Sequence, residues 1–526
     1  MKETVKKATG SFYTCDAVAK FLSRWAITDG KMSVLEPSFG DGAFLDAALS
    51  RFHEMGNPNP SLIGVELRKE AVERASERFP HVSLVQSDFM AFQPDLPIQA
   101  IIGNPPYVRF QNMNQMERHT ALECVKSYGV NLETSGSLWG AFLIHASEML
   151  NRGGKLGFVL PYEVAYVRYA ASLWHYLAQS YGKITLCRVF YDFFPSVDVE
   201  TVLLLAERKG ESTDCVQYGV YRGVANLLAS RPAHVSNIPI QEIMERKKPF
   251  ERELLPKKVA RLLNRLRDEK LLSPLLDVCK FKIGYVSGNK AYFHPSEETV
   301  KRYCLAQENI RHALLNARQV NLPHTGLGTQ ELTEHSNLFY PIMPGEGEQN
   351  YIKYGEQMGV HEAYKCRVRQ PWYKVPGVEI PDVVLTVFGD MPKLLRNDGR
   401  FCVSNSLLGG FLKGVSGEEL ICRWYNSLTL LMIELTIHSL GGGTFVFIPG
   451  ETDRLELLSG LPRQDIARIY KRLAECAQEK SVRDAYALGD RIVLRDICGL
   501  SAEEIHGVHE ALDELRQWRM PEKRRA

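Results

Sequence analysis

The stretch Ile101-Ile102-Gly103-Asn104-Pro105-Pro106-Tyr107 decides how the first half of this chain is interpreted. Two β-branched residues and a glycine run into a polar amide, a proline pair and an aromatic ring. Proline lacks a backbone N–H and fixes φ near −65°, so a strand has to end where the proline pair begins. The residue before a proline is also restricted to an extended conformation. The stretch therefore predicts a strand over residues 98–102 and then a stiff loop.

This loop presents a carboxamide, a proline carbonyl and a phenol ring in fixed positions, which suits a flat ligand that carries an amino group. The Asn104 side-chain oxygen and the Pro105 carbonyl can each accept an N–H bond, and the Tyr107 ring can stack on the ligand's face. Open α/β sheets bind ligands beyond the carboxyl ends of their strands, where this loop is expected. An ordinary proline turn that caps a core strand is the alternative interpretation.

Asn-Pro-Pro-Tyr resembles the signature of methyltransferases that modify a planar nitrogen, either an adenine amine in DNA or RNA or a glutamine amide in a protein. Upstream, Glu36-Pro37-Ser38-Phe39-Gly40-Asp41-Gly42-Ala43-Phe44 resembles the S-adenosylmethionine-binding loop of the same enzymes. The loop lacks Gly-x-Gly-x-x-Gly and Lys-Ser/Thr, so a pyrophosphate or triphosphate is not its natural occupant. An accidental glycine turn is the alternative. The resemblance implies cofactor contacts at Glu36, Ser38, Gly40, Gly42 and Phe44, and at Asn104 of the second motif.

Two later strands are each followed by an acidic residue. Glu66 ends the strand expected over residues 61–66, and Asp88 follows the strand expected over residues 81–85. An acidic residue on the strand after the glycine loop can accept both ribose hydroxyls. We expect that role for Glu66, and we expect Asp88 to accept from an adenine amine while Phe89 packs on the adenine ring. A solvated turn is the alternative for each acidic residue, but the strands recur at βαβ intervals.

Two more motifs of this enzyme group have counterparts here. The segment ending at Thr14 resembles the motif that covers the methionine end of the cofactor, although Cys15 stands where proline is usual. Phe193-Phe194-Pro195 resembles the motif whose aromatic ring holds the target base against the signature tyrosine. The resemblance implies a cofactor contact at Thr14 and a base contact at Phe194. A plain helix N-terminus and a core phenylalanine are the alternatives.

Alternating strands and helices through residue 206 predict an α/β fold. We expect a Rossmann-like methyltransferase domain over residues 1–240, with a mostly parallel seven-stranded sheet closed by an antiparallel hairpin. After Ser230 the βα rhythm stops, and residues 241–526 are expected to form a mixed α+β domain with C-terminal helices. Residues 246–270 contain ten Lys and Arg against four acidic residues. That run fits either a solvated helix face or contacts to phosphates.

Three segments of the second half, residues 281–293, 365–374 and 401–406, mix basic, polar and aromatic side chains. They resemble the DNA-reading half of restriction–modification adenine methyltransferases, and the first of them is expected to be a glycine-bent pair of strands. The resemblance implies DNA contacts at Lys282, Ser287, Lys290, Arg367, Arg369, Trp372 and Asn405. A structural ion pair is the alternative for Arg367 and Arg369.

Cofactor motif, target-amine motif and recognition region follow one another as in the gamma class of DNA adenine-N6 methyltransferases. The resemblance implies methyl transfer from S-adenosylmethionine to an adenine flipped out of double-stranded DNA. It also implies a prokaryotic, cytoplasmic enzyme that acts on the nucleoid, and it allows a cognate restriction endonuclease that acts independently. The alternatives are an RNA or glutamine-amide methyltransferase, a fused nuclease built on Pro381-Asp382, and a non-catalytic DNA-binding protein with a relic cofactor fold.

Composition limits these interpretations. The 64 Lys and Arg nearly balance 62 Asp and Glu, so any nucleic-acid surface has to be local. The longest apolar tract, residues 428–440, contains Glu434 and His438 and is too short to span a bilayer. Eleven cysteines without a Cys-x-x-Cys pair predict reduced thiols and no metal site.

Overall fold

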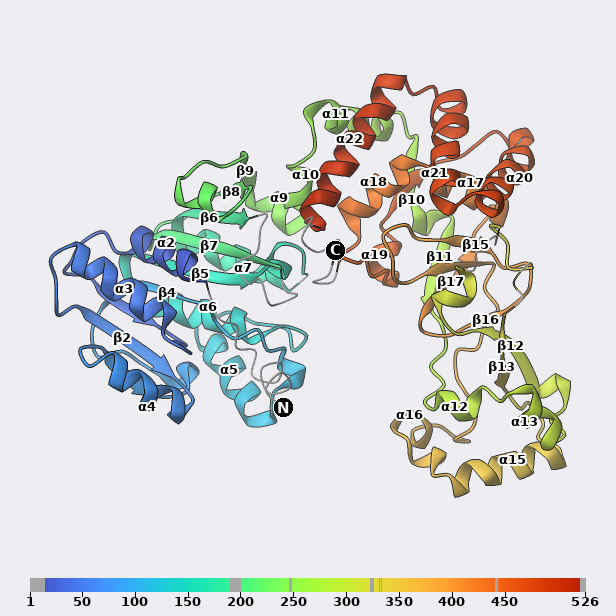
Figure 1. Cartoon of the computed structure of the whole chain (residues 1–526), viewed down its shortest axis with the longest axis horizontal. Helices are drawn as coiled ribbons and strands as arrows, with labels where there is room; N and C mark the ends of the chain where they lie inside the picture. Colours follow the sequence, from blue (N-terminus) through green and yellow to red (C-terminus); the bar gives the residue numbers. More distant parts are fainter. Residues whose placement is uncertain are drawn as a thin grey trace. The chain divides into compact units, whose positions relative to one another are not determined.

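The chain folds into two compact units. The computed structural model describes residues 15–167, 169–189, 200–245, 248–321, 326–330, 332, 334–439 and 443–520. Unit 1 extends to Leu254, and unit 2 extends from Leu255 to Met520 (Figure 1). This division lies later than the sequence-based boundary at residue 240, because the helices α9 (Ile240–Glu245) and α10 (Pro249–Arg252) belong to unit 1.

In the described residues of unit 1, a nine-stranded sheet has the order β3-β2-β1-β4-β5-β7-β6-β8-β9. The strands are β1 (Ser33–Glu36), β2 (Ser61–Glu66), β3 (Ser83–Gln86), β4 (Ile98–Gly103), β5 (Leu150–Pro161), β6 (Tyr181–Val189), β7 (Thr201–Lys209), β8 (Cys215–Tyr221) and β9 (His234–Pro239). Strands β1 to β5 run parallel, and β7 lies antiparallel between β5 and β6. The predicted α/β class and mostly parallel sheet are confirmed.

The predicted number of seven strands is wrong, because β8 and β9 extend the sheet beyond β6. Strand β8 pairs parallel with β6 and antiparallel with β9. Val216, Tyr218 and Val220 alternate along β8 and are fully buried. This period of two is that of a strand with one face in the core. The alternation was visible in the sequence, but no motif marks these strands as part of the domain.

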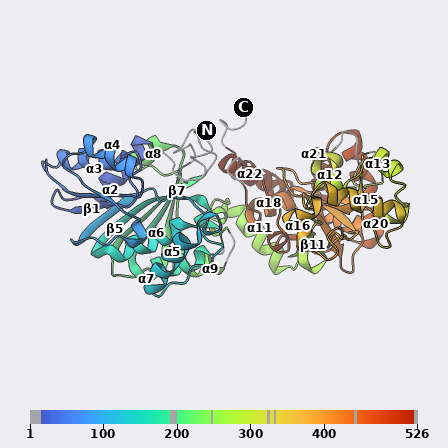
Figure 2. The same ribbon diagram turned by 90° about the horizontal axis from the view of Figure 1, so that it is seen from below.

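Helices cover both faces of this sheet, with α2 and α3 on one face and α5, α6 and α7 on the other (Figure 2). The helices of unit 1 are α2 (Asp16–Ala26), α3 (Ala43–Glu54), α4 (Lys69–Arg78), α5 (Gln115–Ser127), α6 (Leu138–Met149), α7 (Ala170–Ser180), α8 (Val224–Leu228), α9 and α10, with the 3₁₀ turns η1 (Phe89–Ala91), η2 (Phe110–Asn112) and η3 (Tyr162–Ala165). Helix α6 is buried on nearly every side, as expected for an apolar helix in a domain core.

Unit 2 combines small sheets with helices, which agrees with the predicted mixed α+β class. Its sheets have the orders β11-β17-β14-β15, β13-β12-β16 and β10-β18. The strands are β10 (Leu272–Pro274), β11 (Cys279–Ile283), β12 (Ile310–Leu314), β13 (Ser336–Phe339), β14 (Val383–Thr386), β15 (Leu394–Arg396), β16 (Cys402–Val403), β17 (Leu407–Leu412) and β18 (Glu456–Leu458). The strand pair expected over residues 281–293 is wrong, because β11 ends at Ile283 and a short helix follows its loop.

The helices of unit 2 include the C-terminal set predicted from the sequence. They are α11 (Lys257–Asp268), α12 (Lys290–Phe293), α13 (Glu297–Arg302), α14 (Ala317–Val320), α15 (Glu346–Gln357), α16 (Tyr364–Arg367), α17 (Gly417–Trp424), α18 (Ser427–Thr436), α19 (Pro449–Thr452), α20 (Arg463–Glu479), α21 (Val482–Gly489) and α22 (Ala502–Arg519), with η4 (Leu275–Asp277), η5 (Gln307–Asn309), η6 (Val360–Glu362) and the π-helix η7 (Asp490–Ile497).

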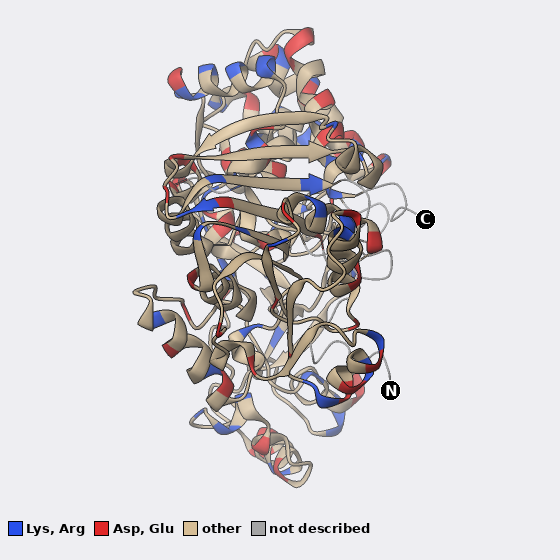
Figure 3. Cartoon of the chain, turned by 90° about the vertical axis from the view of Figure 1, so that its left-hand side faces the viewer, with Lys and Arg blue, Asp and Glu red and all other residues tan. Residues whose placement is uncertain are grey.

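Three basic side chains of α11, which belong to the run of residues 246–270, form ion pairs inside unit 2. Lys258 pairs with Glu503 at 2.6 Å, and Arg265 pairs with Glu504 at 2.9 Å, both on α22. Arg267 pairs with Glu456 at 2.8 Å. For Lys258, Arg265 and Arg267, these ion pairs fit a structural role. On the face of unit 1 that is turned toward the viewer in Figure 3, basic and acidic residues are interspersed.

The end of α22 is fixed to unit 2 by a buried arginine. Arg519 is 6% exposed, and its guanidinium donates to both oxygens of the Glu434 carboxylate at 3.0 and 2.9 Å. A third donor reaches Asp390 at 2.7 Å, and the guanidinium lies 3.8 Å from the centre of the Phe445 ring. Glu434 is 4% exposed, so its carboxylate is solvated mainly by this bidentate pair, with Arg516 3.8 Å away.

We expect Arg519→Ala to destabilise unit 2 by about 3–5 kcal/mol, because it leaves the Glu434 carboxylate buried without its bidentate partner. Urea unfolding followed by tryptophan fluorescence measures this change. Arg468→Ala, which removes an exposed pair with Asp465, is the control and should change the free energy of unfolding by less than about 1 kcal/mol. Equal effects of the two substitutions would contradict the prediction.

Candidate active site

The loop after β4 is hydrogen-bonded to both of its neighbours in the sheet, the loop after β1 and strand β5. The Ser38 hydroxyl, on the loop that follows β1, donates to the backbone carbonyl of Asn104 at 3.2 Å. On the other side, the Tyr107 hydroxyl donates to the backbone carbonyl of Val159 in β5 at 3.1 Å. Asn104 itself is half-buried. These two bonds fix the ends of the Asn-Pro-Pro-Tyr loop relative to its neighbouring strands.

The Tyr107 ring is half-buried. Burial, and then the nearby Glu163 carboxylate, raise the pKa of the Tyr107 hydroxyl well above its usual range. The phenol therefore stays neutral at physiological pH and keeps the proton that it donates to Val159. This bond sets the orientation of the ring.

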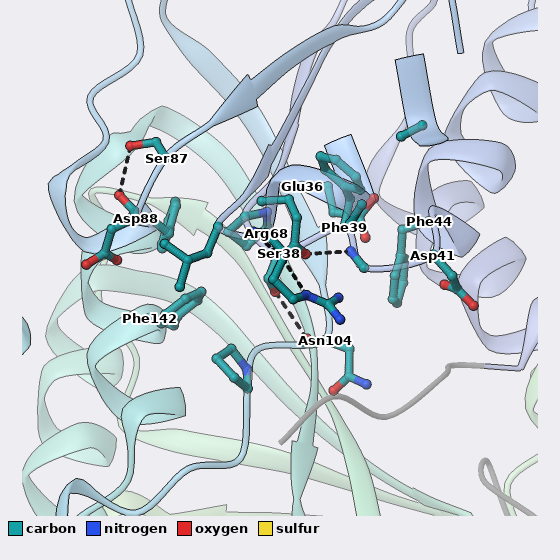
Figure 4. Close-up of a pocket in the computed structure, with 18 of the residues that line it drawn as sticks. Glu36, Ser38, Phe39, Asp41, Phe44, Arg68, Ser87, Asp88, Asn104 and Phe142 are labelled. Atoms are coloured by element: carbon teal, nitrogen blue, oxygen red, sulfur yellow. Dashed lines mark hydrogen bonds and ion pairs between the residues drawn. The ribbon is translucent and has the colours of Figure 1, made fainter. Parts of the chain in front are cut away.

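A cavity of about 710 Å³ lies within unit 1 where β1, β2 and β4 end, and Figure 4 shows its walls. Its volume falls in the usual range for small-molecule sites. Eight residues predicted from the sequence line it: Glu36, Ser38, Gly40, Phe44, Glu66, Asp88, Phe89 and Asn104. Eight of the ten predicted cofactor positions thus lie around one cavity.

The glycine turn after β1 needs left-handed backbone at two positions, with φ of +57° at Gly40 and +86° at Gly42. Glycine adopts this conformation at little cost. Gly42 does not line the cavity, but a Cβ there would lie 2.6 Å from a ring carbon of Phe79. Its role is therefore close packing at the start of α3.

Glu66 joins the glycine turn to the end of β2. One carboxylate oxygen accepts the Gly40 N–H at 3.0 Å, and the other accepts the backbone and side-chain N–H groups of Arg68, each at 3.0 Å. A carboxylate has about four acceptor positions, so it can still accept from a ligand hydroxyl. Glu66 thus fixes the turn and retains acceptor capacity toward the cavity.

Glu36 is a buried carboxyl group in the cavity wall. It is 1% exposed, and its Oε2 has no hydrogen-bond partner among the described residues. Burial, followed by the carboxylates of Asp41 and Glu66, raises the pKa of Glu36 well above its usual range, and the backbone N–H of Leu45 opposes that shift. Such a group is stabilised either by a proton or by a cationic ligand.

Asp88 and Phe89 form the opposite end of the cavity. The Asp88 carboxylate accepts the Met90 N–H at 3.0 Å and so caps η1. The Phe89 ring lies 4.8 Å from that of Phe142 and 5.0 Å from the fully buried His145 ring, measured between ring centres. An aromatic wall thus lies beside a fixed carboxylate. Two other predicted contacts, Thr14 and Phe194, lie outside the described residues.

Two family models match the chain. The model for the Eco57I restriction-modification methylase matches residues 52–192, and the model for the C-terminal domain of the type II methyltransferase M.Eco57I matches residues 247–494. The first match contains the Asn-Pro-Pro-Tyr loop, and the second lies almost entirely in unit 2. The chain is built from Eco57I-type restriction–modification methylase domains.

Relatives agree with this assignment, and a solved structure shares the fold. The type II methyltransferase M.AccI of Acinetobacter calcoaceticus is 22% identical over 415 residues, which are 75% of this methylase and 74% of the relative. M.HincII of Haemophilus influenzae is 27% identical over 202 residues, 38% of each chain. The type IIL restriction-modification enzyme MmeI, solved in complex with DNA, has a TM-score of 0.56 at 11% identity and covers 95% of this chain and 75% of its own.

Part of the methylase cavity was not predicted. Leu67, which follows Glu66, lines the cavity and is 61% exposed, and Phe142 contributes from α6. Asn112, Met113 and Glu117 approach from the segment that leads into α5. An apolar residue directly after an acidic strand end was a usable signal for Leu67. The other positions depend on tertiary packing and carry no local pattern.

The seven residues predicted to contact DNA all lie in unit 2 of the methylase, in three different situations. Lys290, Arg367 and Asn405 are exposed, and Ser287 is half-buried. Lys282 is exposed but pairs with Glu379 at 2.8 Å. Their contacts to DNA remain predictions.

Arg369 and Trp372 have contacts inside unit 2. Arg369 donates to the backbone carbonyls of Val286 at 2.6 Å and Ser287 at 2.9 Å. The Trp372 indole donates to Glu356 at 3.1 Å, and its ring centre lies 5.4 Å from that of Tyr292. Both side chains therefore have a structural role, and the partners of Arg369 are backbone carbonyls, not the acidic residue of the ion pair considered as its alternative.

Three sequence-based expectations concern metals, nuclease chemistry and membranes. Across the described residues of the methylase, no cluster of three or more His, Cys, Asp or Glu side chains is arranged to hold a metal ion. Asp382, considered for a nuclease site, accepts the Leu412 N–H at 2.9 Å. None of the helices within the described ranges is both long and apolar enough to cross a bilayer.

The raised pKa of Glu36 makes the stability of the ligand-free methylase pH-dependent. The native state keeps the Glu36 proton above the ordinary pKa of a glutamate, whereas the unfolded state loses it, so stability falls as pH rises through that interval. We expect Glu36→Gln to remove this decline. Thermal unfolding at a series of pH values measures it.

The matched control is Glu73→Gln, at an exposed position of α4, which should keep the pH profile of the wild type. The stability advantage of Glu36→Gln over the wild type should grow between mildly acidic and mildly alkaline pH. Parallel profiles for all three proteins would contradict a buried, proton-binding Glu36.

Proposed function

We propose that this methylase is a site-specific DNA methyltransferase. It transfers a methyl group from S-adenosylmethionine to the N6 amine of an adenine flipped out of double-stranded DNA. The observation that carries the proposal is the Asn-Pro-Pro-Tyr loop at the carboxyl end of β4, with Asn104 in the wall of the cavity. Methylase domains of the Eco57I type and type II methyltransferase relatives support DNA methylation.

The cavity residues fit S-adenosylmethionine. Glu66 can accept the ribose hydroxyls, and Asp88 with Phe89 can receive the adenine. Glu36, whose buried Oε2 has no partner among the described residues, suits the cationic amino-acid end of the cofactor. When bound, the cofactor supplies an electrophilic methyl group carried on a sulfonium. Gly40 lines the cavity, and a Cβ there would meet no protein atom within 4 Å among the described residues, so the bare glycine backbone would leave that space to the cofactor.

The loop residues would activate the target amine by hydrogen bonding. The lone pair of an adenine amine is delocalised into the ring, which makes the amine a weak nucleophile. By accepting its two protons, the Asn104 side chain and the Pro105 carbonyl would draw the nitrogen toward tetrahedral geometry and free the lone pair. Holding the amine in line with the methyl group is a positioning effect and requires no general base beforehand.

The Tyr107 ring would receive the extruded base. Flipping an adenine out of a duplex costs a few kcal/mol. Stacking on an aromatic side chain is worth about 1–3 kcal/mol per base and offsets much of that cost. The bond from Tyr107 to Val159 supports this role, because it orients the ring before any base arrives. Phe194 is proposed as the second aromatic contact.

The two units would have different functions. Unit 1 carries the cofactor and target-amine residues, and unit 2 is proposed to read the DNA sequence. In a prokaryotic restriction–modification system, such an enzyme works in the cytoplasm beside a cognate endonuclease that acts independently. Methylation of RNA adenine or of a glutamine amide is the alternative within the same chemistry, and a non-catalytic DNA-binding protein is the alternative from another class.

Transfer of a radiolabelled methyl group to duplex DNA, followed by mass spectrometry of the digested nucleosides, tests the proposal. We expect N6-methyladenine in DNA. N4-methylcytosine would overturn the adenine assignment, and label in RNA or protein alone would favour the alternatives. An absence of transfer to all three substrates, with DNA binding retained, would favour the non-catalytic class.

We expect Asn104→Ala to lower kcat/KM for DNA by at least about 100-fold, because the variant loses an acceptor that acts on the reacting amine. Equilibrium binding of the cofactor should be retained. Asn151→Ala, at an exposed position near the start of β5, is the matched control and should keep wild-type activity. Full activity of Asn104→Ala would refute the assigned role of the loop.

A further inference from the structure

Two large apolar side chains protrude from one short segment of unit 2. Tyr364 is 65% exposed and begins α16, and Val368 is 64% exposed and follows its last residue. They are four residues apart, so one helical turn brings them to the same side of the segment. Exposed apolar side chains grouped in this way are informative when charged groups surround them.

Two cations flank the Tyr364 ring. The Lys365 ammonium lies 5.6 Å from the ring centre, and the Arg367 guanidinium lies 5.5 Å from it. Both side chains are exposed. Across the described residues, no ion pair joins Lys365, Arg367 or the neighbouring Lys290 to an acidic side chain. The segment therefore combines apolar surface with positive charge that remains available to a partner.

The segment is held in place from behind. Cys366, between the two cations, is fully buried, and Arg369 bonds to the carbonyls of Val286 and Ser287. Gly288 packs so closely that a Cβ on it would lie 3.0 Å from the Lys365 Cβ. The loop after β11 thus lies against α16. It adds Val286, which is 37% exposed, to the apolar surface.

The acidic groups nearby do not cancel this charge. Glu362 is exposed in the turn before α16, and Glu379 is paired with Lys282. Against the exposed carboxylates of Glu362 and Glu356, the second of which accepts from the Trp372 indole, stand the three cations of Lys290, Lys365 and Arg367. The local charge is complementary to a polyanion, although the whole chain is nearly neutral.

We propose that Tyr364 and Val368 form an apolar ridge that contacts base edges in a groove of duplex DNA, while Lys290, Lys365 and Arg367 contact the phosphates beside it. This inference rests on the proposed DNA substrate and names the surface of unit 2 that reads it. Apolar side chains discriminate bases through contacts such as that with the thymine methyl group, whereas phosphate contacts set position and carry no sequence information.

Substitutions in the ridge and substitutions of its cations should therefore have different effects on DNA binding. Loss of Tyr364 or Val368 should relax the sequence preference. Loss of Arg367 or Lys365 should weaken binding to every duplex and reduce the slope of log K against log salt by about one for each phosphate that is no longer neutralised.

A binding selection tests the inference without any need for methyl transfer. The full-length chain is mixed with a pool of 30-base-pair duplexes of random sequence, and the bound DNA is sequenced. We expect the wild type to enrich a motif. Tyr364→Ala and Val368→Ala should relax that motif at one or more positions, with at least about tenfold weaker binding to the enriched duplex. Both variants should bind a duplex of shuffled sequence with nearly the affinity of the wild type.

The matched control is Ile342→Ala, which also truncates an exposed apolar side chain of unit 2, 61% exposed. It should enrich the wild-type motif at wild-type strength. Tyr364→Phe should retain the motif, because the ring is kept. Circular dichroism and thermal unfolding confirm that each variant is folded, which is expected since both ridge residues are exposed.

The inference is overturned if the ridge variants enrich the wild-type motif with unchanged strength, or if the wild type enriches no motif at all. It is separable from the proposed reaction. Binding and enrichment by the wild type without methyl transfer to the enriched duplex would refute the reaction and leave the ridge intact. Methyl transfer at wild-type rate by the ridge variants would refute the ridge and leave the reaction intact.

Discussion

The candidate site depends on hydrogen bonds that tie three parallel strands together at their carboxyl ends. Glu66, at the end of β2, accepts the N–H of Gly40 on the loop after β1. Ser38, on the same loop, donates to the carbonyl of Asn104 after β4. The cavity walls are thus connected through side chains and not only through the sheet. Because each bond joins residues far apart in sequence, the cavity forms only when the strands have the correct order.

Most of the first unit could be predicted from local patterns. Apolar strands, glycine turns and acidic strand ends recur in the βαβ rhythm, and the signature loop supplied the chemistry. Eight of the predicted residues line one cavity. Strands β8 and β9 were missed, since no motif marks them and they follow the hairpin that was expected to close the sheet. Phe142 was missed because a buried helix gives no local sign of which residue faces a ligand.

The second unit was less predictable, since basic and aromatic residues can either contact nucleic acid or bond within the fold. Arg369 and Trp372 have the residue types of nucleic-acid contacts but bond within the fold. The two carbonyls that accept from Arg369 lie 82 and 83 residues earlier in the chain. No local pattern encodes such a pairing. Tyr364 and Val368, in the same segment, received no role from the sequence, although they are the more exposed pair.

The extension of the sheet by β8 and β9 affects how the protein avoids unwanted association. An open sheet edge presents unpaired backbone groups and can pair with another chain. In this sheet the final strand, β9, alternates exposed and partly buried positions and ends in Pro239, whose nitrogen cannot donate. The opposite edge, β3, is four residues long. The two added strands thus cover β6 and leave β9, which ends in a proline, as the border of the sheet, so a fragment cut before residue 215 would expose the backbone groups of β6 to pairing with another chain.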